Sequence, residues 1–211
     1  MLTRMEEKIL AEVCRGAAEI PERIRGRMMN CKAANKYFNP VQGDWRAEHE
    51  IVRLNSLELW IAMQVGQARN DESMSKGSTP GYAFKGTPAQ MEQIHISGAA
   101  GEVATARYMD VYFPASVGTY AAADLLPDIQ VRTRSKQHYD LIVRSKDHIN
   151  DRYVLVIDLC PNYHIIGWMF GRDARKQQWI QTYDNRPSAW FVPQASLEDP
   201  YYLKQKEEAV R

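Results

Sequence analysis

The chain has 211 residues, of which 45% are hydrophobic and 25% charged, a globular composition that excludes a wholly disordered or collagen-like chain. Its 27 lysines and arginines against 26 aspartates and glutamates give a net charge of +1, which excludes a uniformly basic surface but allows a local basic patch. The sequence contains no uninterrupted apolar run of about 18 residues, and Glu6 and Glu7 stand where a signal peptide would be apolar. We therefore expect a soluble, cytoplasmic protein that is not exported and has no membrane partner.

The beginning of the chain is predicted to be helical. Apolar residues at helical spacing predict one helical segment over residues 1–35, interrupted at Pro21, and a second helix over 44–69 with Asp44 as its N-cap. Together they form an N-terminal helical region, residues 1–69. Its apolar stripes suit packing against the rest of the chain, and they equally suit a homodimer or another protein partner.

The next segment, residues 70–86, is rich in Ser, Gly and Lys, which predicts a mobile loop or linker. Thr87 then begins a Thr-Pro-Ala-Gln capping box that predicts a helix reaching about Met109. Gly98 and Gly101 lie inside this helix, where each costs roughly 1 kcal/mol relative to alanine. Two interpretations remain open for them: close packing of the helix on a sheet, or close approach of a ligand or another backbone.

After this helix the apolar residues alternate, as they do in strands. Extended runs separated by turn residues are predicted over residues 111–113, 128–134, 139–144, 153–159 and 164–170, followed by a short helix over 173–176 and a strand over 189–192. The predicted fold class is α/β (α+β), with mostly antiparallel strands in one central mixed sheet that helices flank. Residues 199–211 are predicted to be a C-terminal tail.

The strand predicted over 128–134 carries polar groups on one side. Strand alternation places four of them on one face, Asp128, Gln130, Arg132 and Arg134. Burying such a face without partners is unfavourable, so a solvated edge strand is the simplest interpretation. A functional site is the alternative, because Asp124 lies just upstream and the glycine-flanked Glu102 lies in the preceding helix.

Three segments, GAAGEVATARYM, AAADLLPD and QVRTR, resemble the motifs of the PD-(D/E)XK nuclease superfamily. That family has a glutamate in a leading helix, an aspartate at a strand and an acid-x-Lys triplet, and Glu102, Asp124 and the triplet beginning at Gln130 stand in these places. The segments YDLIVRSKD, RYVLVIDL, YHIIGWMFGRDARK and WFVPQASL also resemble this fold, in particular small, mostly uncharacterised phage and prophage proteins. The resemblance covers residues 90–198 and implies a restriction-endonuclease-like domain over 87–198.

The resemblance implies a Mg²⁺- or Mn²⁺-dependent nuclease that hydrolyses phosphodiester bonds in DNA. Glu102 and Asp124 would be catalytic metal ligands. Gln130 replaces the third acid and offers only an uncharged amide oxygen, and Asp128 could restore the missing carboxylate. Arg132 replaces the lysine; it would stabilise phosphate charge, but it cannot act as a base because arginine stays protonated.

Other residues suggest contacts with nucleic acid. Basic side chains cluster near the triplet, which indicates either phosphate contacts or a solvated face: Arg132, Arg134, Lys136 and Arg144. His95, two helical turns before Glu102, would position water or touch substrate, or else be a structural histidine. Four aromatic residues suit either base stacking or the core: Tyr139, Trp168, Trp179 and Trp190.

Three functions therefore stay open. The first is a nuclease, and the second is a nuclease-fold module that binds DNA or a protein without cleaving, which Gln130 and Arg132 favour. The third is a phage structural or assembly protein that docks through the N-terminal helices. The three cysteines lack a CxxC pair and the five histidines lack i, i+4 spacing, so we expect neither zinc nor disulfides.

Overall fold

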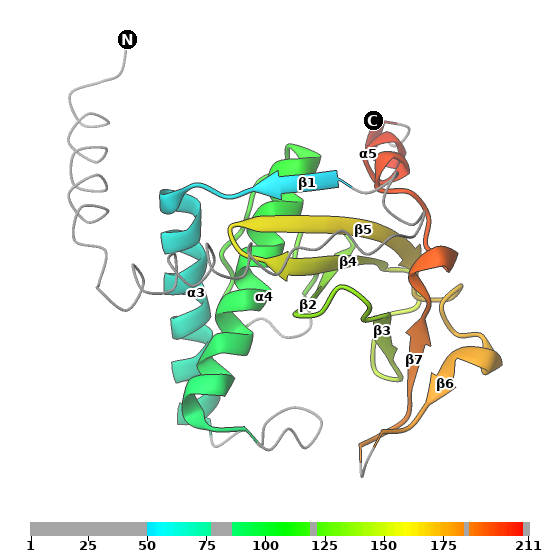
Figure 1. Cartoon of the computed structure of the whole chain (residues 1–211), viewed down its shortest axis with the longest axis horizontal. Coiled ribbons are helices and arrows are strands. Elements are labelled where there is room, and N and C mark those ends of the chain that lie inside the picture. The colour runs from blue at the N-terminus through cyan, green and yellow to red at the C-terminus, as the bar shows by residue number, and fades with distance from the viewer. Residues whose placement is uncertain (1–49, 77–85, 119–121, 184–185, 209–211) are drawn as a thin grey trace.

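The computed structural model describes residues 50–76, 86–118, 122–183 and 186–208 (Figure 1). The helical segment predicted over 1–35 lies outside these ranges, as do Asp44 and residues 77–85 of the predicted loop. Within the described ranges, none of the helices combines the length with the apolar run that crossing a bilayer needs.

The helix predicted over 44–69 differs from the structure at both ends. Strand β1 (Glu50–Arg53) occupies part of that range, and helix α3 (Ser56–Ser75) begins later and extends into the predicted loop. The start is fixed by a capping box, in which the Glu58 N–H donates to Asn55 Oδ1 at 3.0 Å and the Asn55 N–H donates to Glu58 Oε2 at 2.7 Å. This local capping, together with the pairing of β1, overrides the helical apolar pattern of the preceding residues.

Helix α4 (Pro88–Met109) confirms the next prediction, including its capping box. The Thr87 N–H donates to Gln90 Oε1 at 2.8 Å, and the Gln90 N–H donates to Thr87 Oγ1 at 3.3 Å. Asp110, in the left-handed conformation with φ 57°, ends the helix. α3 and α4 pack side by side (Figure 1).

The described strands form two sheets, whereas one central sheet was predicted. The larger is a mixed sheet of order β1-β5-β4-β2, whose remaining strands are β2 (Ile129–Arg134), β4 (Arg152–Leu159) and β5 (Asn162–Phe170). β2 runs parallel to β4, and the other neighbours are antiparallel. The smaller sheet has the order β3-β7-β6, and its strands are β3 (Leu141–Arg144), β6 (Ile180–Gln181) and β7 (Ala189–Val192). The single-sheet prediction is wrong because β3 pairs with β7 and leaves β2 at an edge.

Most predicted strands are confirmed in position. Three predicted segments need correction: one strand, one helix and the C-terminal tail. Residues 111–113 form no strand: the Val111 N–H donates to Ala106 O at 3.0 Å as the chain leaves α4, and the alternating apolar side chains pack on the core. The helix predicted over 173–176 is a turn that precedes the 3₁₀ helix η4 (Gln177–Trp179). The predicted tail contains α5 (Pro200–Glu208), which follows a second 3₁₀ turn, η5 (Gln194–Ser196).

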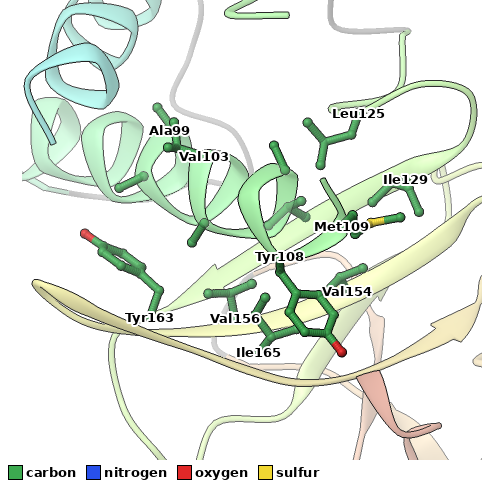
Figure 2. Packing of buried hydrophobic residues seen from close by; sticks show 14 of the residues in the cluster. Ala99, Val103, Tyr108, Met109, Leu125, Ile129, Val154, Val156, Tyr163 and Ile165 are labelled. Carbon is green, nitrogen blue, oxygen red and sulfur yellow. The ribbon is translucent and has the colours of Figure 1, made fainter. Parts of the chain in front are cut away.

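The mixed sheet is buried on both faces, because residues of β4 alternate between two hydrophobic clusters. Val154 and Val156 face α4, and Figure 2 shows this packing with Val103 of the helix. Leu155 and Ile157 belong to the second cluster, which β3 and β7 cover. The protein therefore has a mixed α/β fold in three layers, with helices, the mixed sheet and the small sheet in succession (Figure 1).

Gly101 brings α4 close to β2. A Cβ added there would lie 1.9 Å from Thr133 Oγ1 and 3.1 Å from Thr133 Cβ, so only glycine fits. At Gly98, by contrast, an added Cβ would meet no described atom within 4 Å. The packing interpretation is therefore confirmed for Gly101 and has no support at Gly98.

Candidate functional site

Asp124 is held beside β2 by a tight hairpin. The Leu125 N–H donates to Ile129 O at 3.1 Å, and the Ile129 N–H donates to Leu125 O at 2.9 Å. The chain therefore reverses just before β2, and Asp124 lies alongside the strand. Its Oδ2 accepts a hydrogen bond from the Val131 N–H at 2.8 Å, which fixes the carboxylate near the middle of β2.

The predicted faces are confirmed within β2, whereas Asp128, predicted on the polar face, lies just before the strand. Val131 and Thr133 lie on the side of α4, whereas Gln130, Arg132 and Arg134 share the side of the second cluster. β2 is an edge strand, as the simpler interpretation required, but the Arg132 side chain is only 16% exposed. The polar face is thus half-buried and needs partners, which the simple picture of a solvated edge does not include.

A buried ion pair holds Glu102. Arg69 of α3 donates from Nη1 to Oε1 at 2.6 Å and from Nη2 to Oε2 at 2.8 Å, a bidentate arrangement with the carboxylate 7% exposed. The Arg69 Nε donates to Ser116 O at 2.8 Å, which fixes the guanidinium further. On the strand side, Arg132 Nη1 lies 4.0 Å from Asp124 Oδ2. We call Arg69, Glu102, Asp124 and Arg132 the acid–arginine cluster.

Burial governs the charges of this cluster. It raises the pKa of Glu102 above its ordinary value, against the opposing hydrogen bonds of Arg69, and the nearby Asp124 carboxylate raises that pKa further. Burial also raises the pKa of Asp124, against the Val131 N–H and Arg132. The two predicted acids therefore do come together, and two arginines favour their ionised forms.

His95 lies near this cluster as well. It is half-buried, and burial and the Arg69 charge both lower its pKa. The imidazole is therefore disposed to be neutral at physiological pH, and it lies beside an ion pair instead of the basic surface. Its contact with nucleic acid stays a prediction.

The other two predicted ligands have partners elsewhere. Gln130 Nε2 donates to Asp151 Oδ2 at 3.0 Å, on the β4 side of the strand. Asp128 forms a bidentate pair with Arg152, whose Nη2 lies 2.5 Å from Oδ1 and whose Nε lies 3.1 Å from both carboxylate oxygens. Arg132 also donates from Nη2 to Asp147 Oδ2 at 3.0 Å.

These partners bear on the predicted Mg²⁺ or Mn²⁺ site. Hard divalent ions take several oxygen ligands, chiefly carboxylates. In the described part of the chain, no group of three or more His, Cys, Asp and Glu side chains is disposed to hold a metal ion, and Arg69 occupies both oxygens of Glu102. As it stands, the ion pair with Arg69 engages the oxygens that Glu102 would offer to a metal, and the ligand roles of Glu102, Asp124, Gln130 and Asp128 stay predictions.

Two of the remaining predicted basic residues line a pocket, and Lys136 is not among its lining residues. The pocket has a volume of about 470 Å³ and lies where the end of β2 meets β3, β6 and β7. Arg134 and Arg144 line it, as predicted for nucleic-acid contacts, and Arg186 joins them. Burial lowers the pKa of Arg134, and the Arg144 and Arg186 charges lower it as well, whereas Tyr139 and Asp140 raise it. We call this hollow the basic pocket.

Aromatic rings accompany the basic groups. The Arg134 guanidinium lies 4.5 Å from the centroid of the Tyr139 ring, and the Lys136 ammonium lies 5.4 Å from the same centroid. Tyr183 and Phe191, which also line the pocket, form an edge-to-face pair with centroids 4.9 Å apart. The stacking of Tyr139 on a base stays a prediction.

The tryptophans lie elsewhere. Trp168 and Trp179 are buried in the two clusters, which confirms the core interpretation, and Trp190 contacts the Arg175 guanidinium at 5.1 Å. Sequence reasoning missed Arg69, Arg186 and the Tyr183–Phe191 pair, because each joins its site through pairing or packing of distant segments. No protein-family model matches the chain, and no curated protein or solved structure matches it either.

Proposed function

We propose that the protein binds nucleic acid by its phosphate backbone, as a module with a restriction-endonuclease-like fold. The observation that carries this proposal is the convergence of three guanidinium groups, of Arg134, Arg144 and Arg186, on one concave surface. Guanidinium groups bind phosphate bidentately and keep their charge at all physiological pH values. A near-neutral protein that gathers like charges in one hollow has a local site for a polyanion.

The electrostatics of Arg134 support an anionic ligand. Burial lowers the pKa of Arg134, and the charges of Arg144 and Arg186 lower it as well, while Tyr139 and Asp140 raise it. The two neighbouring arginines therefore repel the Arg134 guanidinium. A phosphate group in the pocket would offset this repulsion.

The hairpin before β2 supports the fold assignment. Glu102 from a helix, Asp124 from the hairpin and Arg132 from the following strand gather in the order that the resemblance implies. The departures also gather there, because Arg69 holds Glu102 and Gln130 turns to Asp151. This pattern favours recognition over cleavage.

Single substitutions in the basic pocket should weaken DNA binding. Arg134→Ala, Arg144→Ala and Arg186→Ala each remove one phosphate contact, so each should reduce the slope of log affinity against log salt by about 1. The measurement is fluorescence anisotropy of labelled DNA across a salt series. Arg53→Ala is the matched control, because Arg53 is exposed on β1 at the opposite edge of the mixed sheet. This substitution should change neither the DNA affinity nor its salt slope. A DNA affinity that none of the three pocket substitutions changes, or that does not depend on salt concentration, would overturn the proposal.

Metal-dependent cleavage is a second candidate, favoured by the closeness of Glu102 and Asp124. Both carboxylates are already engaged by donors of the protein, Arg69 and the Val131 N–H. The binding function proposed above therefore predicts equal DNA binding in Mg²⁺, Mn²⁺ and EDTA, and no cleavage product on a denaturing gel. Cleavage that requires the metal and is abolished by both Glu102→Gln and Asp124→Asn would establish the nuclease instead. Circular dichroism would show that each variant is folded.

A further inference from the structure

The basic pocket has an aromatic side that phosphate binding alone does not explain. Tyr183 is 53% exposed although it pairs edge-to-face with the ring of Phe191. The hydroxyl of Tyr183 donates a hydrogen bond to Gln181 Oε1, which orients the ring at the end of β6. An oriented, exposed aromatic ring beside guanidinium groups suits a ligand that has both a flat apolar face and an anion.

The net charge and the volume of the basic pocket limit the class of ligand that it can bind. Asp140 is the one carboxylate among the described residues that line the pocket, so three arginines against one acid leave two positive charges. The volume of about 470 Å³ falls within the range of roughly 300–1,000 Å³ that small-molecule sites occupy. A single nucleotide unit matches this size, charge and chemistry.

The aromatic contact also selects the form of the nucleic acid. Inside a duplex both faces of each base are covered by its neighbours, so a protein ring reaches an internal base only where that base is unpaired. Apart from its two terminal pairs, a blunt duplex therefore offers the pocket its phosphates but not its bases.

Resting on the proposed function, we propose that the basic pocket takes an unpaired nucleotide of single-stranded nucleic acid. Its base stacks on the Tyr183–Phe191 pair, and its phosphate binds the arginines. The protein accordingly prefers single strands, or duplexes with single-stranded ends, to blunt duplexes.

The test compares four labelled probes by anisotropy at one salt concentration: a DNA single strand, the same sequence as a blunt duplex, that duplex with an overhang, and the single strand with abasic sites. The single strand and the overhang should bind about tenfold more tightly than the other two, since one stacked base contributes about 1–3 kcal/mol. An RNA strand of the same sequence shows whether the sugar matters.

Tyr183→Ala should lower single-strand affinity about tenfold and leave blunt-duplex affinity unchanged. Phe191→Leu, which keeps an apolar side chain in β7, should act in the same direction. Tyr202→Ala is the matched control, because Tyr202 of α5 is 52% exposed and lies outside the pocket.

Two failures are distinguishable. Equal binding of single strand and blunt duplex, unaffected by Tyr183→Ala but weakened by Arg134→Ala, would overturn this inference and leave the proposed function standing. Absence of salt-dependent binding to any probe would overturn the proposed function as well.

Discussion

Gly66→Ala is expected to destabilise the protein by about 3 kcal/mol, at the upper end of the usual overpacking range. The reason is the contact between α3 and α4, where a Cβ on Gly66 would lie 2.4 Å from Ile96 Cα and 2.6 Å from Ile96 N. These are backbone atoms, so no side-chain rotation relieves the overlap and the two helices must separate. The measurement is urea denaturation followed by circular dichroism.

Gly98→Ala makes the same chemical change as Gly66→Ala but should have the opposite effect on the stability of the protein. Gly98 is internal to α4, two residues from Ile96, but an added Cβ meets no described atom within 4 Å. Removing the backbone freedom of glycine from a helix should stabilise the protein by up to about 1 kcal/mol. Equal shifts of the same sign in the two variants would contradict the packing account of the α3–α4 contact.

The two glycines also show what the sequence predicts and what it does not. α4 was predicted correctly because its capping box and apolar spacing are local signals. The roles of Gly98 and Gly101 were left open because they depend on which element lies opposite, and only the fold places Thr133 against Gly101. The start of α3 was missed although Asn55 and Glu58 form a capping pair, because the strand pairing of β1 has no local signature.

Pairing between strands that are distant in the sequence explains the remaining differences between the predicted fold and the structure. Alternation in β2 predicted its two faces correctly, yet it did not indicate that β3 joins β7 in a second sheet. That pairing places Arg144 opposite Ala189 and Ile142 opposite Phe191, and so it creates the basic pocket. The sequence therefore predicted individual basic residues of the surface, whereas the hollow and its aromatic side arise only from the topology.

Arg69→Met is expected to destabilise the protein by about 3–5 kcal/mol at neutral pH, the range for breaking a buried ion pair by removing one partner. Methionine fills similar space but leaves Glu102, 7% exposed, as a buried carboxylate without its bidentate donor. Sequence gave no sign of this pair, because Arg69 and Glu102 meet only through the packing of α3 on α4. Chemical denaturation at several pH values measures the effect.

The destabilisation should shrink on acidification. The pKa of Glu102 is already raised above its ordinary value of 4.5, so the folded state binds a proton at Glu102 more tightly than the unfolded chain does. The free energy of unfolding therefore falls as the pH rises from the unfolded-state pKa of Glu102 to its folded-state pKa. Without Arg69 the pKa rises further and this pH range extends upward, so the loss should be smaller at about pH 5 than at neutral pH.

The double variant Arg69→Met with Glu102→Gln separates charge from packing. It removes the buried charge altogether, so it should recover most of the lost stability at neutral pH and abolish the added pH dependence. Arg69→Lys keeps a positive charge near Glu102 but loses the bidentate geometry, and its cost should lie between that of the wild-type arginine and that of methionine. An equal, pH-independent loss in Arg69→Met and the double variant would assign the effect to the lost contact with Ser116 O, and the acid–arginine cluster would then contribute little to holding α3 on α4.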